Sequence, residues 1–317
     1  MKVCTFGELL IDVTPYGVSD KGYPVCEFNP GGAPANVAVA LKNLGVEASF
    51  IGQVGDDHYG RFLKSVLDSK GVDTTGLILN PMYPTSLAIV SLGEGGERSF
   101  SFYRKNGADV SVSFNPLFQS KLEEADAFHC GSVSLSDEPA RSATLDMLKY
   151  AHHLGKVVSF DVNLRALLWD DLHEAKKMIE RSLPFVDILK VSEEELAFLK
   201  ADLSEEEALA SISKEHPISM ILVTYGDKGS AVYYKNTLIK VPAFKVDSID
   251  TTGAGDAFFG AFLASVYDSK KTLEAFTTNE LKQYLKRANA CGAIATLKKG
   301  AIGSLPNLKE LNAFLEK

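Results

Sequence analysis

The chain has 317 residues, of which 45% are hydrophobic and 23% are charged, and its formal net charge at pH 7 is −8. This length suits one large α/β domain, and the composition is ordinary for a globular protein. The acidic balance, without any cluster of Lys and Arg, argues against nucleic acid as a partner. No stretch approaches the roughly 20 apolar residues that cross a membrane, so we expect no membrane partner either.

The expected location is the cytoplasm. The first eight residues reach an acidic side chain too early for a secretory signal. The four cysteines, Cys4, Cys26, Cys130 and Cys291, are scattered and form no CxxC pair. We therefore interpret them as reduced thiols rather than as disulfides or metal ligands.

The predicted elements begin with a strand over residues 2–11. The glycine-rich fingerprint of a dinucleotide-binding fold does not follow this strand, which disfavours an NAD dehydrogenase. Residues 14–30 are rich in Pro and Gly and are interpreted as irregular. A helix that starts at Pro34 comes next, and a strand over 49–54 leads into a further helix.

From residue 85 to residue 103 the pattern changes to that of a β-hairpin with a glycine-rich turn. Phe100 and Phe102 alternate with polar residues in its second arm, so we expect one face of the hairpin to be covered. Two excursions from the core, at about 13–30 and 84–110, are predicted to form a small β lid.

Beyond residue 115, buried strands alternate with amphipathic helices. Strands are predicted over residues 127–130, 156–161, 186–191, 219–224, 230–235 and 238–242, and helices over 138–154, 173–183, 193–199, 205–213, 254–268, 279–297 and 307–316. This alternation is typical of a mostly parallel sheet with helices on both faces. The predicted fold class is therefore α/β, doubly wound, with a small β lid.

Residues 250–256 read DTTGAGD and lie between an extended stretch and a helix. Free backbone N–H groups and the positive end of the helix dipole make such a helix N-terminus an anion site. Gly253 and Gly255 have no Cβ, so phosphate oxygens can approach the main chain. Asp256 opposes phosphate binding there unless its task is to take a proton. The combination indicates phosphoryl transfer with Asp256 as general base.

Two segments, taken together, resemble the signatures of the ribokinase-like (PfkB) sugar kinases. One is GGAPANVAVAL at residues 31–41, and the other is DTTGAGDAFFGAF at residues 250–262. Residues 52–57 and 300–306 are also similar to segments of that family, and no Walker loop is present as a competing phosphate site. The resemblance covers essentially the whole chain and implies a single kinase domain over residues 1–317.

The resemblance implies the residues that contact the sugar and the transferred group. Asp256 matches the catalytic base of the family, and the backbone amides of Gly253, Ala254 and Gly255 match its anion hole. Sugar contacts are implied or suggested for Asp12, Gly32, Asn36, Tyr103, Arg104 and Arg165. The last of these closes a DVNLR stretch that follows a predicted strand, at the edge where open α/β sheets bind ligands.

The resemblance also implies ATP, Mg²⁺ and possible K⁺ sites. The segment KVSEEE at 190–195 occupies the place of the NxxE motif of the family, with Ser192 where Asn is usual. Glu195 matches the residue that organises Mg²⁺ through water. Nucleotide contacts are implied for Lys190, Ser192, Thr224, Gly226, Gly229 and Asn289. A K⁺ ion beside the anion hole is implied by matches at Asp250, Thr252, Gly300 and Ser304.

The resulting functional prediction is an ATP-dependent sugar kinase that phosphorylates a primary hydroxyl, with fructose as the favoured sugar. The alternative is a 2-keto-3-deoxygluconate kinase, because Tyr103, Arg104 and Arg165 could hold a carboxylate. The residues after Arg104 resemble fructokinases more. A nucleoside kinase and a non-catalytic sugar sensor are further alternatives. The resemblance also implies a possible homodimer formed through the lid, with Phe100 and Phe102 as candidate contacts.

Overall fold

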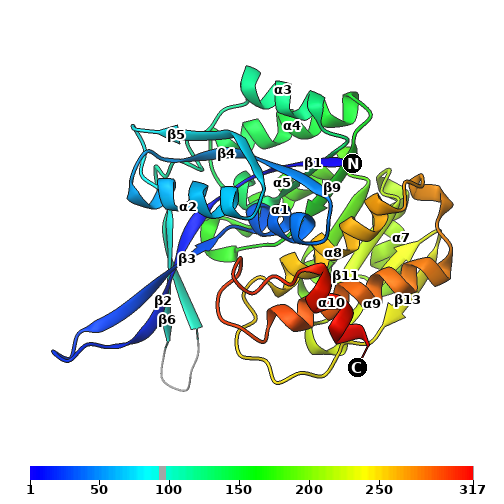
Figure 1. Cartoon of the computed structure of the whole chain (residues 1–317). Helices are drawn as coiled ribbons and strands as arrows, with labels where there is room; N and C mark the ends of the chain where they lie inside the picture. Colours follow the sequence, from blue (N-terminus) through cyan, green and yellow to red (C-terminus); the bar gives the residue numbers. More distant parts are fainter. Residues whose placement is uncertain (93–97, 317) are drawn as a thin grey trace.

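Nine strands form one sheet in the order β13-β12-β11-β10-β9-β8-β1-β4-β5 (Figure 1). The computed structural model describes residues 1–92 and 98–316. Seven neighbouring strands are parallel, and the hairpin β12–β13 adds two antiparallel strands at one edge. Their bounds are β1 Lys2–Phe6, β4 Glu47–Gly55, β5 Asp73–Asn80, β8 Ala127–Gly131, β9 Val157–Asp161, β10 Ile188–Ser192, β11 Met220–Thr224, β12 Ser230–Tyr234 and β13 Thr237–Val241.

Helices cover both faces of this sheet, which confirms the predicted doubly wound α/β fold. The consecutive residues Ile188 and Leu189 of β10 are fully buried but belong to two separate hydrophobic clusters, one on each face. One face carries α1 Ala33–Asn43, α2 His58–Ser69, α8 Ala254–Asp268, α9 Thr278–Ala295 and α10 Leu308–Leu315. The other carries α3 Pro116–Glu124, α4 Ala140–His153, α5 Leu172–Ser182, α6 Glu193–Leu199 and α7 Glu205–Glu215.

A second, four-stranded sheet in the order β3-β2-β6-β7 projects from the main body (Figure 1). Its strands are β2 Leu10–Val18, β3 Pro24–Gly31, β6 Leu87–Leu92 and β7 Arg98–Tyr103. The predicted hairpin at 85–103 is present as the antiparallel pair β6–β7. Its turn, residues 93–97, lies outside the described residues.

Two expectations for the N-terminal region were wrong. The strand predicted over residues 2–11 is two strands, because β1 ends at Phe6 and β2 starts at Leu10 in the other sheet. Residues 14–30, expected to be irregular, form most of the hairpin β2–β3. Pro15 lies where the register of that hairpin shifts, a position where the missing N–H of Pro is tolerated. Sequence reasoning also missed β5 and α3.

The order of the strands places a ligand-binding edge beside β1. From β1 the main sheet continues to β4 and β5 on one side, and later strands from β8 onward lie on the other side. In open α/β sheets, ligands bind at the carboxyl ends of the strands where the order reverses in this way. None of the helices in the described part of the chain has the length and apolarity that a membrane crossing requires.

Candidate active site

A cavity of about 460 Å³ opens at this edge, between the small sheet and the N-termini of α1 and α8. The predicted residues Asp12, Gly32, Asn36, Arg165, Lys190, Thr252, Gly253, Gly255 and Asp256 all line it. Segments that lie far apart in the sequence therefore meet at one place. The cavity is also lined by residues to which sequence reasoning gave no role in the site: Glu8, Leu10, Ala33, Ala88, Phe102, Val133, Asn163, Leu168 and Thr251.

The start of α8 shapes one wall of the cavity. Gly253 precedes the helix with φ 77°, a left-handed conformation that favours glycine. A Cβ atom at this position would lie 3.0 Å from the Cα of Ala301, so the backbone packs closely there. The first turn of α8, including Ala254 and Gly255, thus directs the positive end of the helix dipole toward the cavity.

Asp256 lies in the first turn of α8, with its side chain beside Asn36 of α1. The Nδ2 of Asn36 donates a hydrogen bond of 2.7 Å to Oδ2 of Asp256. Burial raises the pKa of Asp256 to about 6, although the bond from Asn36 acts to lower this pKa. The nearby Asp161 raises it further, and Lys190 lowers it. A carboxylate with such a pKa can take a proton near neutral pH.

Two more carboxyl groups, those of Glu8 and Asp12, line the same cavity. Burial raises the pKa of each to about 7. Glu8 accepts a 2.8 Å hydrogen bond from the backbone N–H of Ala33 at the start of α1. Gly32, just before α1, has φ 117°, and a Cβ there would lie 2.3 Å from the backbone oxygen of Glu8. Sequence reasoning placed Glu8 inside one strand over residues 2–11 and gave it no role in the site.

Lys190 and Asp161 form a buried ion pair between this cavity and a neighbouring one of about 370 Å³. Burial acts to lower the pKa of Lys190, but the charges of Asp161 and Glu195 outweigh it, so this pKa is raised. The ammonium group lies near the helix N-terminus, because a Cβ built on Gly255 would be 3.4 Å from Nζ of Lys190. Lys190 therefore places a positive charge beside the predicted anion site. Sequence reasoning had given no role to Asp161.

Ser192 and Glu195 form a capping box at the start of α6. The hydroxyl of Ser192 accepts from the backbone N–H of Glu195 at 3.1 Å, and Glu195 Oε2 accepts from the N–H of Ser192 at 2.8 Å. Glu195 Oε1 accepts from the N–H of Leu164 at 2.7 Å. The serine that replaces the usual Asn of the motif thus completes a cap. Both residues line the neighbouring cavity, next to Lys190.

Three of the four residues expected around a monovalent cation, Asp250, Thr252 and Gly300, are joined by hydrogen bonds. Oδ1 of Asp250 accepts from the backbone N–H and hydroxyl of Thr252 at 3.0 and 2.7 Å. Oδ2 of Asp250 accepts from the N–H of Gly300 at 3.1 Å, which ties the two loops together. Ser304 is fully buried, and its hydroxyl donates to the backbone oxygen of Ala301.

Arg104 and Tyr103 do not line the cavity in this structure. Nε of Arg104 donates to Oδ2 of Asp109 at 2.6 Å, and Nη1 donates to Ser136 at 2.7 Å, in a buried network behind the cavity wall. Tyr103 is 65% exposed. Arg165, in contrast, is exposed and lines both cavities.

The remaining predicted nucleotide residues lie on β11, on the turn after it and on α9. Thr224 ends β11, Gly226 begins a short 3-10 turn, and Gly229 follows that turn. Asn289 is buried and holds α9 to the edge hairpin, because its side chain bonds Ser230 at 2.7 Å and the backbone oxygens of residues 241 and 242 at 3.2 and 3.1 Å.

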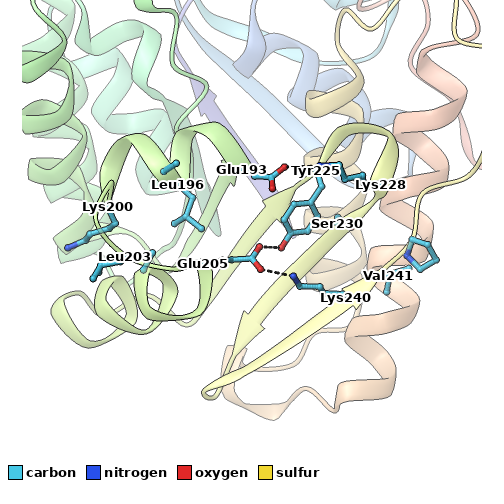
Figure 2. A pocket seen from close by; sticks show the side chains of 13 residues that line it. Glu193, Leu196, Lys200, Leu203, Glu205, Tyr225, Lys228, Ser230, Lys240 and Val241 are labelled. Carbon is cyan, nitrogen blue, oxygen red and sulfur yellow. Dashed lines mark hydrogen bonds and ion pairs between the residues drawn. The ribbon is translucent and has the colours of Figure 1, made fainter.

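A separate cavity of about 630 Å³ lies between α6, α7 and the hairpin β12–β13 (Figure 2). Most of its charged groups pair with each other: Glu205 accepts from the hydroxyl of Tyr225 and from Lys240, and Lys228 contacts Glu193. Lys200 pairs with Glu215, which does not line the cavity. These pairings occupy the charged groups that the cavity wall contributes. The cavity that contains Asp256 instead brings together most of the residues that the sequence analysis selected.

No group of three or more His, Cys, Asp or Glu side chains lies at metal-binding geometry within residues 1–92 and 98–316. Mg²⁺ often keeps several waters and binds through one or two carboxylates together with phosphates of the substrate. Glu195, at the cavity next to Lys190, fits such a water-mediated role.

Comparison with known proteins identifies the family. Residues 1–308 match the family described as pfkB family carbohydrate kinase. Fructokinase-1 of Zea mays is 43% identical over 99% of this chain and 98% of its own length. A fructokinase of Xylella fastidiosa, solved with bound ATP, superimposes with a TM-score of 0.91 at 31% identity and covers 99% of this chain and 98% of its own.

A second solved structure is a double mutant of the fructokinase of Vibrio cholerae O395, in a form with bound fructose, ADP and potassium ion. It is 36% identical, has a TM-score of 0.87, and covers 99% of this chain and 98% of its own. Family match, sequence identity and fold agree over almost the whole chain. The chain belongs to the pfkB family of carbohydrate kinases.

Proposed function

We propose that this chain is a fructokinase, which transfers the γ-phosphoryl group of ATP to the primary hydroxyl of fructose and yields fructose 6-phosphate. The observation that carries the proposal is the carboxylate of Asp256 at the N-terminus of α8, inside a cavity and with its pKa raised to about 6. The names of the relatives, which are fructokinases, support the choice of sugar.

In the proposed reaction, Asp256 takes the proton of the sugar hydroxyl while the oxygen of that hydroxyl attacks the γ-phosphorus. The new bond joins the sugar oxygen to phosphorus, and the bond from phosphorus to the β–γ bridging oxygen breaks to release ADP. The amides of Gly253, Ala254 and Gly255 and the ammonium group of Lys190 stabilise the negative charge of the transferring group. Mg²⁺, held through water near Glu195, would neutralise further phosphate charge when it is bound.

The structure favours a neutral sugar over 2-keto-3-deoxygluconate. Of the three residues that could hold a carboxylate, Arg104 is paired with Asp109 and Tyr103 does not line the cavity. Arg165, the third of these residues, does line the cavity, together with the carboxyl groups of Glu8, Asp12 and Asp256. A sugar acid would therefore meet a surplus of negative groups.

A substrate panel tests this proposal. ATP, Mg²⁺ and K⁺ are combined with fructose, 2-keto-3-deoxygluconate or adenosine, and ADP release is measured. We expect fructose to have the largest kcat/KM. A kcat/KM for fructose at least tenfold below that of another acceptor, about 1.4 kcal/mol, would overturn the choice of sugar. Sugar binding without ADP release would instead favour the sensor.

We also propose that the small sheet acts as a lid in a single kinase domain over residues 1–317. Leu10, Ala88 and Phe102 of this sheet line the cavity, so movement of the sheet would open or cover the sugar. A cover of this kind excludes water that would otherwise hydrolyse ATP. Replacement of residues 19–23 by Asn-Gly, a two-residue hairpin turn, shortens the tip but keeps β2 and β3 connected, and tests whether ATP hydrolysis without sugar is affected.

The lid is further proposed to pair two copies of the chain into a homodimer. Apolar side chains project into solvent from β2, β3 and the turn between them, in the hairpin that extends from the body in Figure 1: Tyr16 69%, Val18 72%, Tyr23 66%, Val25 38% and Phe28 43% exposed. Exposed patches of this kind often mark interfaces. Phe102 lines the cavity instead, and the side chain of Phe100 lies outside the described residues.

Light scattering of the wild type and of the double substitution Tyr16→Ser, Val18→Ser tests the homodimer. A dimer that the substitution converts to a monomer is the expected result.

The proposed location is the cytoplasm, where ATP is supplied and the free cysteines, including the exposed Cys26, remain reduced. A fluorescent fusion found outside the cytoplasm would contradict it.

A further inference from the structure

The general base is held by a residue from a distant part of the chain. Asn36 is buried in the first turn of α1, and its Nδ2 donates to Oδ2 of Asp256 at 2.7 Å. A donor at one oxygen of a carboxylate fixes the plane of the group and stabilises its charged form. It also leaves the other oxygen, Oδ1, to accept the proton of the substrate.

The carbonyl oxygen of the Asn36 side chain, unlike its nitrogen, makes no hydrogen bond within the described part of the chain. Oδ1 of Asn36 is buried and has no hydrogen-bond partner in the structure. A buried acceptor without a partner is unfavourable, and the side chain lines the cavity. A sugar hydroxyl next to the reacting one would satisfy this oxygen. A single amide can thus contact the substrate and the base at the same time.

The turn that carries Asn36 is fixed by Glu8. Oε1 of Glu8 accepts from the N–H of Ala33 at 2.8 Å, at the first residue of α1. No side chain caps this helix start in the usual way, since the preceding residue is Gly32. Glu8 therefore replaces a local cap with one from the segment between β1 and β2.

We propose that Asn36 is a positioning residue for Asp256, held in place by Glu8, and that Oδ1 of Asp256 is the oxygen that takes the proton of the sugar. This inference rests on the proposed kinase function and deepens it. Asn36 orients the base and keeps it ionised, in addition to any contact with the sugar. Neither Glu8 nor the link from Asn36 to the base was apparent from the sequence.

Other charged groups around Asp256 also affect its pKa, and a substitution of Asn36 leaves these groups in the protein. They come from β2, β9, the segment after β9, and β10: Asp12, Asp161, Arg165 and Lys190. The hydrogen bond from Asn36 lowers the pKa of Asp256, as do the charges of Lys190 and Arg165. Its loss should therefore raise this pKa, and the acid limb of the pH profile should move to higher pH.

The experiment uses Asn36→Ala in the full chain, with Asn43→Ala as the matched control. Asn43 is on the same helix, but its Nδ2 donates to the backbone oxygen of Leu305, away from the cavity. At saturating fructose, we expect Asn36→Ala to lower kcat about tenfold or more and to move the acid limb of kcat to higher pH. The control should retain the wild-type limb. A limb that stays in place in Asn36→Ala, even with a raised KM, would overturn the proposal.

A second pair of substitutions tests the role of Glu8 and covers the case in which one variant fails to fold. Glu8→Leu removes the acceptor for the N–H of Ala33, whereas Glu8→Gln keeps an acceptor oxygen of similar reach. We expect Glu8→Leu to move the acid limb in the same direction as Asn36→Ala, and Glu8→Gln to recover most of that change. Equal effects of the two substitutions would show that the charge of Glu8 matters rather than its hydrogen bond, and would overturn its part of the proposal.

A titration without turnover separates this inference from the proposed function. The carboxyl carbon of Asp256 is followed by carbon-13 NMR in aspartate-labelled protein, with Asp256→Asn used to assign the signal. A pKa that rises in Asn36→Ala supports the inference even if fructose proves to be the wrong sugar. An unchanged pKa of Asp256 in Asn36→Ala would contradict the inference even if fructose is phosphorylated.

Discussion

Nζ of Lys190 lies 2.9 and 2.8 Å from the two carboxylate oxygens of Asp161, and both side chains are buried at the edge of the candidate sugar cavity. The pair joins β9 to β10, which are neighbours in the main sheet. It keeps a positive charge next to the start of α8 without leaving it unpaired in the interior.

Asp161→Asn should destabilise the protein strongly, because it removes the charge that compensates buried Lys190. The expected decrease in the free energy of unfolding is about 3–5 kcal/mol, measured by urea denaturation. Asp146→Asn is the control, since Asp146 pairs with Lys149 at 3.7 Å on the surface and both are more than half exposed. That substitution should change the stability by less than about 1 kcal/mol. Similar effects at the two sites would contradict the role given to the buried pair.

Asp256→Asn should keep ATP binding and lose most turnover, because an amide cannot accept the proton of the hydroxyl. We expect kcat to fall by about 10²–10⁴-fold. ATP affinity, measured by calorimetry, should not fall, because the substitution removes a negative charge from the anion site. Turnover close to that of the wild type would rule out Asp256 as the base.

The pH profile should show an acid limb that reports Asp256. Its pKa is raised to about 6, and the base must be unprotonated to act, so activity should be lost as the pH falls through about 6. The limb should be visible in kcat/KM for the sugar, which reports groups of the free enzyme. Asp12 and Glu8, with pKa values of about 7, can contribute to the same limb if they must be ionised. Constant activity down to pH 4.5 would contradict an ionised base with this pKa.

Gly253→Ala should impair both stability and phosphoryl transfer. A residue with a Cβ at φ 77° costs about 1–2 kcal/mol, and the added carbon would also meet Ala301 at 3.0 Å. We expect a higher KM for ATP and a lower kcat, because the start of α8 must shift.

Gly155→Ala provides the matched control for this substitution. Gly155 has φ 68°, but nothing lies within 4 Å of its added Cβ, and it does not line the cavity. Its stability cost should be of the same order, about 1–2 kcal/mol, with unchanged kinetic constants. Equal kinetic effects at the two glycines would mean that global stability, rather than the anion site, explains the result.

Replacement of K⁺ by tetramethylammonium should lower kcat by roughly tenfold, or about 1.4 kcal/mol, if a cation is held near Asp250 beside the start of α8. The loops of residues 250–252 and 300–304 are linked by the bond from Gly300 N–H to Asp250. Asp250→Asn should reduce the response to K⁺. Identical kcat in the two salts at matched ionic strength would argue against a functional cation site.

The sequence predicted the elements that depend on local patterns. The strands and helices beyond residue 115 were located to within a few residues, apart from the helix Pro116–Glu124, because buried strands and amphipathic helices have distinct periodicities. The start of α8 was also predictable, since glycine at 253 and the apolar run after Asp256 mark a helix N-terminus. The break between β1 and β2 was not predicted, because only Gly7 and Glu8 interrupt the residues on either side, and the division becomes clear only when the two strands join separate sheets.

The sequence by itself determined that a glycine-flanked carboxylate stands at a helix N-terminus, and therefore indicated an anion site with a base. Only the tertiary structure decided which groups surround that carboxylate. Asn36 and Asp256 are 220 positions apart, and their hydrogen bond exists because α1 and α8 pack side by side on one face of the sheet. Tertiary packing likewise decides that Glu8 accepts from Ala33, that Asp161 pairs with Lys190, and that Arg104 pairs with Asp109 rather than lining the cavity. Local patterns specify turns and helix starts, whereas contacts across the sequence depend on how the completed layers pack.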